Sequence, residues 1–186
     1  SENEQCKIVC DYLSSIKGVS GFVYRNYCPT GTKNTEFPRQ YFSDHNGRLC
    51  DAVRETIDRW YNDKLIGKDE FYFLLTSLLE SIDKCANTAS VYGAFLKKIK
   101  KTAANNMKIK PADIFYNDKE HHVYNKDVNE LVEEIEGDIL YLDPPYNHRQ
   151  YATNYHVLET IARYDNPKLK GKTGLRDYAK QKSLYC

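Results

Sequence analysis

The sequence has no hydrophobic run long enough to cross a membrane, because no stretch approaches the roughly 18 apolar residues that a transmembrane helix needs. Its first ten residues also lack the basic and then apolar pattern of a signal peptide. The six cysteines include no Cys-x-x-Cys pair, and no histidine stands near them in ligand spacing, so neither a zinc site nor a disulfide framework is indicated. These absences predict a soluble, cytoplasmic protein with no membrane partner.

Excess charge of one sign is also missing, since the formal net charge is +1 over 186 residues, and this argues against a simple polycation. Lysines are nevertheless clustered: residues 97–110 hold six lysines and no acid, and residues 166–182 hold five lysines and one arginine against Asp177 alone. Two such stretches fit a surface that contacts phosphates. The alternative for each is a solvated helix end or tail.

The hydrophobic content of 41% is enough for a buried core, and the length suits one domain or one domain with a large insertion. Apolar residues spaced by three and four predict amphipathic helices over residues 43–61 and 69–86, packed against each other. Shorter helices are expected over residues 5–16, 90–101 and 154–164. Glycines and prolines predict a long irregular stretch over residues 18–38.

The pattern changes after Pro111. Residues 122–124 read as a short strand, residues 127–135 as a short helix, and residues 138–142 (Asp-Ile-Leu-Tyr-Leu) as a buried strand. A strand, a helix and a strand in this order are typical of a parallel α/β sheet. We therefore expect an α/β fold.

The second predicted strand leads directly into Asp143-Pro144-Pro145-Tyr146. A carboxylate at the carboxyl end of a buried parallel strand lies where open α/β sheets bind ligands. Two consecutive prolines stiffen the turn and leave carbonyl oxygens as acceptors. Without its context the same tetrapeptide would be an ordinary turn.

This turn suits chemistry on the exocyclic amino group of adenine, whose lone pair is delocalised into the ring. Acceptors for both amino hydrogens would make that nitrogen more tetrahedral and hence more nucleophilic. Asp143 and the Pro144 carbonyl could supply them, while Tyr146 could stack on a base that has left the duplex.

The motif resembles the catalytic motif of adenine-specific DNA methyltransferases that use S-adenosylmethionine, in particular the Dam-like group and related restriction-modification methylases. The resemblance implies Asp143, Pro144, Pro145 and Tyr146 as catalytic residues and double-stranded DNA as the substrate. It also implies a cognate restriction endonuclease as a genetic partner only. The implied fold is a partial Rossmann-like methyltransferase sheet with a large helical insertion.

Other residues extend the resemblance. Tyr151, Asn154 and Tyr155 are similar to the aromatic stretch that helps to close over the flipped base, although the two tyrosines could simply pack at helical spacing. Asp127 matches the acidic residue near the adenine ring of the cofactor, although it could equally cap a helix. We also expect Lys97 and Lys98 to contact DNA.

One feature of the family is missing, because none of the nine glycines forms the Gly-x-Gly of its cofactor loop. We therefore expect the middle part of a longer enzyme, with residues 1–110 as a largely helical insertion for DNA recognition and residues 111–186 as part of the catalytic domain. We also expect this chain alone to bind S-adenosylmethionine weakly. The alternatives are a DNA-binding fragment with a vestigial turn, and a methyltransferase that acts on RNA or a protein amide.

Overall fold

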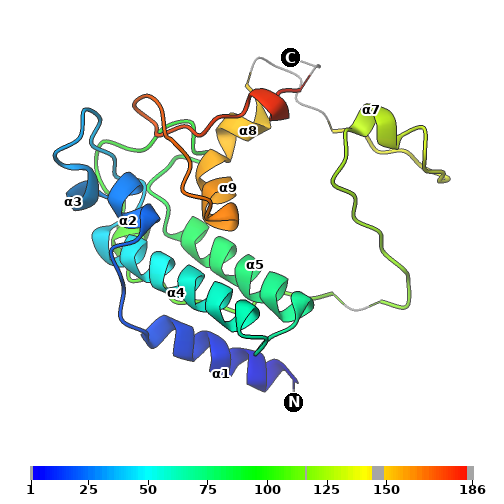
Figure 1. The fold of residues 1–186 in the computed structure, drawn as a ribbon, viewed down its shortest axis with the longest axis horizontal. Helices are drawn as coiled ribbons and strands as arrows, with labels where there is room; N and C mark the ends of the chain where they lie inside the picture. Colours follow the sequence, from blue (N-terminus) through cyan, green and yellow to red (C-terminus); the bar gives the residue numbers. More distant parts are fainter. Residues whose placement is uncertain (1, 116, 144–148, 184–186) are drawn as a thin grey trace.

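The computed structural model describes residues 2–115, 117–143 and 149–183 (Figure 1). Its helices, in chain order, are α1 (Glu2–Ser15), α2 (Phe22–Tyr27), α3 (Pro29–Thr32), α4 (Asp44–Asn62), α5 (Lys68–Lys84), α6 (Lys101–Ala104), α7 (Val128–Leu131), α8 (Tyr151–Asn154), α9 (His156–Arg163) and the 3₁₀ turn η1 (Ala179–Gln181). None of the helices in these described ranges is long and apolar enough to cross a membrane.

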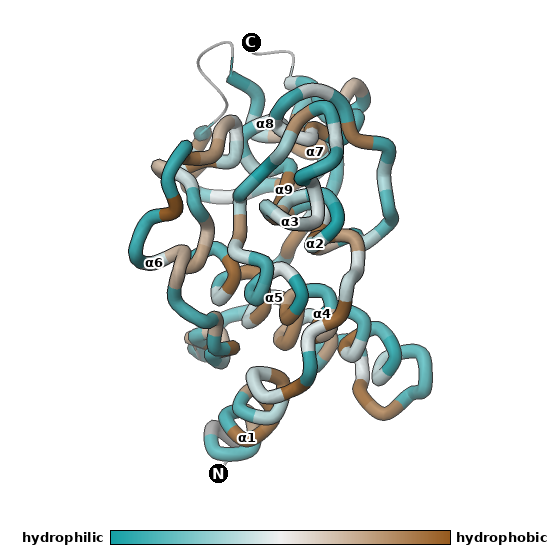
Figure 2. Tube along the Cα trace, turned by 90° about the vertical axis from the view of Figure 1, so that its left-hand side faces the viewer, coloured by the Kyte–Doolittle hydropathy of each residue, from teal (hydrophilic) through white to brown (hydrophobic). Residues whose placement is uncertain are grey.

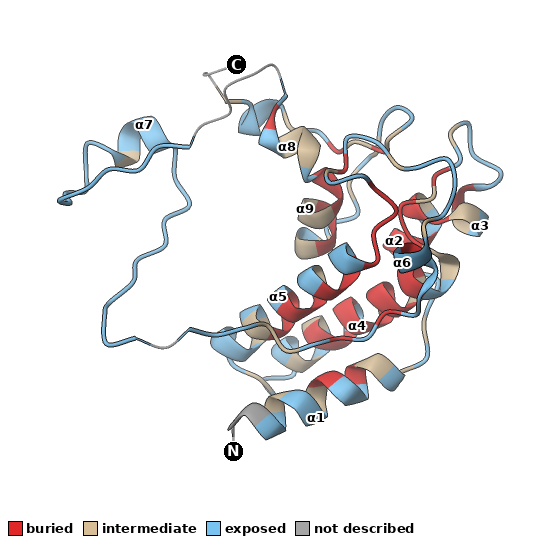
Figure 3. Cartoon of the chain, turned by 180° about the vertical axis from the view of Figure 1, so that it is seen from behind, coloured by how far each residue is buried: buried red, intermediate tan, exposed pale blue. Residues whose placement is uncertain are grey.

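The two long helices α4 and α5 form the centre of the fold and pack against each other, as the sequence predicts (Figure 1). Ser43 ends the preceding segment and caps α4, because its hydroxyl accepts a hydrogen bond from the Asn46 amide at 3.3 Å. At the start of α5, the Glu70 carboxylate accepts from the Gly67 amide at 2.9 Å. Hydrophobic and hydrophilic residues alternate along both helices (Figure 2), and their apolar faces are buried in the core (Figure 3).

Other helix predictions had mixed outcomes. The helix expected over residues 5–16 is α1, and the one expected over residues 154–164 is divided into α8 and α9. The prediction of a helix over residues 90–101 was wrong. There the Asn87 side chain accepts from the Lys100 amide at 3.0 Å and donates to the Leu96 carbonyl at 3.0 Å, which holds the segment in a loop.

The irregular stretch expected over residues 18–38 contains α2 and α3, so that prediction was also wrong. The first amides of α2 find their acceptor far along the chain. Val23 and Tyr24 donate to the two oxygens of the Asp51 carboxylate on α4, at 2.8 and 2.9 Å. A carboxylate in this position stabilises a helix N-terminus, and local sequence gives no sign of it.

The prediction of a Rossmann-like α/β sheet was wrong. The described residues contain no strand, and their β-pairing is a single antiparallel bridge between Lys170 and Leu175. Residues 122–124 and 138–142 are exposed coil, with Ile139 89% and Tyr141 83% exposed. A buried parallel strand needs hydrogen-bonding neighbours and covered faces, and the described part of the chain supplies neither. The apolar pattern alone therefore did not make a strand.

Residues 117–142 leave the helical body on an extended path and return through α7 (Figure 1). Almost all of this segment is exposed (Figure 3). The helix expected over residues 127–135 is limited to α7 and has no buried residue. The division expected at residue 110 stays a prediction, and α9, which follows the exposed segment, contributes Val157 and Ile161 to the same hydrophobic core as α4 and α5.

Candidate active site

A pocket of about 680 Å³ lies between the exposed segment and the body of the protein. It is lined by four separate stretches of the chain: residues 125–129, residues 141–143, Tyr151, and residues 180–183. Its volume lies in the range of small-molecule binding sites. Three residues that the sequence predicts for the site, Asp127, Asp143 and Tyr151, line this one pocket.

Asp143 reaches the pocket at the end of the exposed apolar segment. Its carboxylate is exposed, so both oxygens can accept hydrogen bonds from a bound group. The other predicted catalytic residues, Pro144, Pro145 and Tyr146, lie outside the described residues.

Asp127 caps α7. Its Oδ1 accepts from the Asn129 amide and from the Asn129 side chain, both at 2.9 Å. The capping interpretation of this residue is therefore confirmed. In the described part of the chain no hydrogen bond engages Oδ2, and the residue also lines the pocket. The cap and a contact with a ligand are compatible, and the role toward a cofactor stays a prediction.

Tyr151 begins α8 and Tyr155 directly follows it, with ring centroids 6.4 Å apart and ring planes inclined by 50°. They are 43% and 46% exposed, so core packing does not account for them. Tyr151 lines the pocket, whereas Tyr155 is outside its lining. Between them, the Asn154 carbonyl accepts from the Tyr92 amide at 2.7 Å and ties α8 to the loop after α5.

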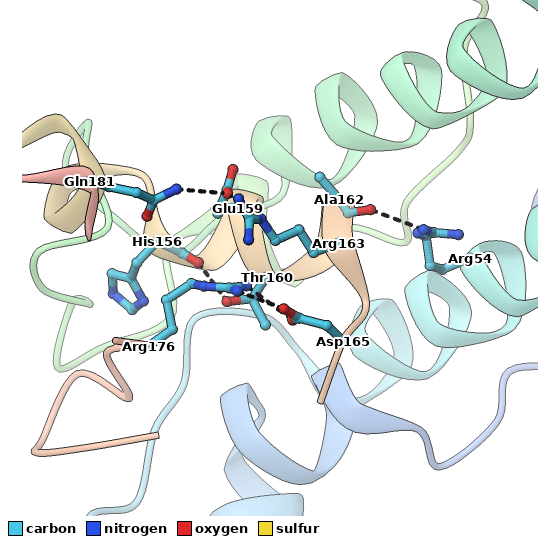
Figure 4. Close-up of polar contacts among 9 residues, drawn as sticks. All are labelled: Arg54, His156, Glu159, Thr160, Ala162, Arg163, Asp165, Arg176 and Gln181. Carbon is cyan, nitrogen blue, oxygen red and sulfur yellow. Dashed lines mark hydrogen bonds and ion pairs between the residues drawn. The ribbon is translucent and has the colours of Figure 1, made fainter. Parts of the chain in front are cut away.

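The buried residue His156 anchors α9 just after this aromatic pair, and no local sequence pattern predicts it. Burial lowers the pKa of His156 from its ordinary value near 6.5 to about 4, so the imidazole is neutral at pH 7. Because a carbonyl only accepts, Nε2 donates to the Tyr92 carbonyl at 3.1 Å. At the other end of α9, Arg54 donates to the Ile161 carbonyl at 3.0 Å. It also donates to the Ala162 carbonyl at 2.9 Å (Figure 4).

The C-terminal segment of the pocket, residues 180–183, is a part of the site that the sequence did not predict. Buried Gln150 holds it, because its Oε1 accepts from the Ser183 amide at 2.7 Å. Gln181 donates to the Glu159 carboxylate of α9 at 3.2 Å (Figure 4). The sequence marks these residues only as the end of the second lysine-rich stretch, and that pattern predicts no pocket.

The pocket carries charges of both signs. Asp127 and Asp143 provide carboxylates, and Lys126, Lys180 and Lys182 provide ammonium groups. Lys126 forms an ion pair with Glu134 at 2.5 Å. A pocket of this kind can bind a molecule that itself carries both positive and negative groups.

Lys97 and Lys98, expected to contact DNA, are exposed in the loop that precedes α6. They are outside the pocket lining. The structure therefore brings together Asp127, Asp143 and Tyr151 but not these two lysines.

Comparison with known proteins relates this chain to one protein family. A protein-family model described as D12 class N6 adenine-specific DNA methyltransferase matches residues 12–186. The chain is 53% identical to type II methyltransferase M.NlaIII of Neisseria lactamica over 175 residues, which are 94% of this chain and 50% of that protein. It is 44% identical to type II methyltransferase M.FokI of Planomicrobium okeanokoites over 186 residues, 100% of this chain and 27% of the relative.

A third relative, modification methylase StsI of Streptococcus sanguinis, is 43% identical over 166 residues, 89% of this chain and 24% of its own length. The chain thus spans half or less of these curated relatives. A search of solved structures found no match.

Proposed function

The chain belongs to the D12 class N6 adenine-specific DNA methyltransferase family, and from this premise we propose that it serves the transfer of a methyl group to the exocyclic amino group of adenine in double-stranded DNA. One observation carries the proposal: Asp143, Asp127 and Tyr151 line one pocket. The names of the relatives, two type II methyltransferases and a modification methylase, support a role in a restriction-modification system.

Asp143 would act on the reacting amine. An exposed carboxylate can accept an amino hydrogen, which orients the amine and increases the electron density on its nitrogen. As the new nitrogen–carbon bond forms, the bond between the methyl carbon and its donor would break and leave its electron pair on the donor. The nitrogen then becomes positive, and the nearby carboxylate would stabilise that charge until a proton is lost to water. Pro144 would accept the second amino hydrogen through its carbonyl, and Tyr146 would stack on the extruded base.

Tyr151 would contact the same base from α8. Its ring is partly exposed at the pocket and contacts Tyr155, so the two rings offer an aromatic surface to an unstacked base. Stacking of a base on an aromatic side chain contributes about 1 to 3 kcal/mol. Together with Asn154, these residues would hold the adenine while Asp143 engages its amine.

The methyl donor we propose is S-adenosylmethionine, which supplies an electrophilic methyl group on a sulfonium. Its ammonium, sulfonium and carboxylate groups match a pocket that carries both carboxylates and ammonium groups. Asp127, with Oδ2 engaged by no hydrogen bond in the described residues, would contact one end of the cofactor. The residues present therefore fit the donor.

A substrate panel tests the proposal. The protein is incubated with S-adenosylmethionine carrying a radioactive methyl group, at a concentration high enough to offset the weak binding expected for this chain, and with one of three acceptors: duplex DNA, an RNA of the same sequence, or a glutamine-containing peptide. We expect label in N6-methyladenine of the DNA and none in the other two. Label in RNA or peptide alone would contradict the proposed substrate, and the same DNA with its adenines already N6-methylated is the matched control.

A further inference from the structure

A lysine-rich turn follows α9 and is fixed by its own backbone. Lys170 and Leu175 exchange two hydrogen bonds of 2.9 Å, which close a short antiparallel hairpin. Gly171 and Gly174 have φ of +65° and +67°, a left-handed conformation that glycine adopts without a steric cost. We call residues 168–175 the lysine hairpin.

The outer face of the lysine hairpin is positive. Lys168, Lys170 and Lys172 are exposed, while Leu169 between the first two packs against the hydrophobic core. No acid occurs between residues 166 and 175. The nearest acid on the chain, Asp165, is already paired with Arg176 at 2.7 Å (Figure 4). In the described part of the protein, no ion pair involves these three lysines.

A buried arginine holds the turn in place. Arg39 is 8% exposed, and its guanidinium donates to the Gly171 and Lys172 carbonyls at 2.9 and 3.1 Å and to the Asn26 carbonyl at 3.2 Å. Its described partners are thus neutral carbonyls, so its positive charge is not cancelled locally and adds to that of the lysines. Tyr27 completes the support, because its hydroxyl donates to the Gly174 carbonyl at 3.1 Å.

The first lysine-rich stretch is attached to the same support. Gln40, next to Arg39, donates to the Leu96 carbonyl at 2.6 Å, directly before Lys97 and Lys98. Arg39 therefore hydrogen-bonds to the lysine hairpin, and its neighbour Gln40 hydrogen-bonds to the residue directly before the Lys97–Lys98 loop. The two basic stretches, far apart in sequence, are connected through two adjacent residues.

The lysine hairpin also lies near α8, which carries Tyr151. Tyr27 bonds to Gly174 through its hydroxyl, and its ring centroid is 6.3 Å from that of His156, the first residue of α9. One aromatic side chain thus separates the lysine hairpin from the junction between α8 and α9. The lysine hairpin and the helix that carries Tyr151 therefore belong to one packed part of the protein.

We propose that the lysine hairpin, together with Lys97 and Lys98, binds the phosphates of the DNA duplex and positions it on the protein; this rests on the proposed function. Lysines that neutralise phosphates release counterions and make affinity depend on salt. Because the turn is already fixed by Arg39 and Tyr27, little ordering cost is incurred on binding. The contact is to the backbone, so it positions the duplex and does not read its sequence.

The test measures how affinity for DNA depends on salt. A fluorescent 30-base-pair duplex of arbitrary sequence is titrated with the protein between 50 and 200 mM NaCl, and Kd is obtained from anisotropy. For K170Q/K172Q we expect the slope of log affinity against log salt to become shallower by about 2, since each lysine–phosphate contact contributes about 1. The control K64Q/K68Q removes two exposed lysines at the junction of α4 and α5 and should keep the original slope.

Parallel slopes for the unchanged protein and K170Q/K172Q, with the circular dichroism spectrum unaltered, would overturn the proposal. So would a loss of slope of equal size in the control, or no salt-dependent binding by the unchanged protein. The methyl-transfer panel gives an independent outcome. Binding without methylation would refute the proposed function while the slopes still decide the role of the lysine hairpin, and methylation with parallel slopes would refute only the lysine hairpin.

Discussion

The Tyr164 hydroxyl donates a hydrogen bond to the Asp51 carboxylate at 2.8 Å and so connects the end of α9 to α4. The same carboxylate accepts from the first amides of α2. Burial raises the pKa of Asp51, and these donors lower it in part. The Asp51 carboxylate on α4 therefore connects this helix to α2 and to Tyr164, the residue that follows α9.

Replacing Tyr164 by Phe removes one donor to this buried acid. We expect Tyr164→Phe to lower the free energy of unfolding by about 1 kcal/mol, the usual net value of one hydrogen bond, with a larger loss if Asp51 is left poorly solvated. Urea unfolding at pH 7, followed by circular dichroism, measures this. Tyr178→Phe is the matched control, since no hydrogen bond of that hydroxyl is found among the described residues, and equal losses in both variants would contradict the role of Tyr164.

His156 makes stability depend on pH. Its pKa is about 4 in the folded protein and near 6.5 when unfolded, so between these values the unfolded chain binds more protons. Stability is therefore unaffected by His156 above pH 6.5 and falls as pH decreases toward 4, by an amount on the order of 3 kcal/mol for a fully buried group.

We expect the urea midpoint of His156→Gln to vary less between pH 4.5 and 7 than that of the unchanged protein. The exposed residue His45 provides the control, because His45→Gln should keep the original pH dependence. Identical pH profiles for the unchanged protein and His156→Gln would show that the histidine is not the titrating group.

The sequence was sufficient for α4 and α5, because helical periodicity and caps such as Ser43 are local signals. It was insufficient where a side chain distant in sequence decides the local structure. Asp51 caps α2 from 27 or 28 residues away, and Asn87 prevents a helix over residues 90–101. The expected strand at residues 138–142 was wrong because a strand is defined by its neighbours, and the described residues supply none.

The residues of the candidate site likewise divide into those that local sequence predicts and those that distant residues bring into place. Asp127, Asp143 and Tyr151 could be chosen from the sequence because each belongs to a recognisable local pattern. The pocket residues 180–183 could not, because they reach the site through Gln150, which is 33 residues from Ser183 along the chain. Side chains recruited by tertiary contacts leave no pattern in the local sequence.

Arg39 should matter for stability as well as for the shape of the lysine hairpin. Arg39→Met leaves three backbone carbonyls without their donor, and we expect a loss of about 2 to 3 kcal/mol in the free energy of unfolding. The lysine hairpin should also become more sensitive to trypsin, which cleaves after lysine, in limited digestion under native conditions. Arg59→Met is the control, because Arg59 is exposed, and it should leave both stability and cleavage unchanged. Unchanged cleavage at residues 168–172 in Arg39→Met would contradict the role of Arg39 in holding the lysine hairpin.

The most direct test of the chemistry is Asp143→Asn, which keeps the size of the side chain but removes its negative charge. We expect methyl transfer to fall by at least about 100-fold, because a charged acceptor at the reacting nitrogen contributes mainly in the transition state. DNA affinity should stay within a few fold, since the duplex is positioned by phosphate contacts elsewhere. Single-turnover rates and anisotropy titrations separate the two effects.

Asp138→Asn is the matched control for this prediction, because Asp138 is an exposed acid on the same segment but outside the pocket lining. It should methylate DNA at the rate of the unchanged protein. If Asp143→Asn retained full activity, Asp143 would not be the acceptor for the adenine amine. If Asp138→Asn lost as much activity as Asp143→Asn, the effect would belong to the charge of the whole segment and not to a carboxylate at the reacting nitrogen.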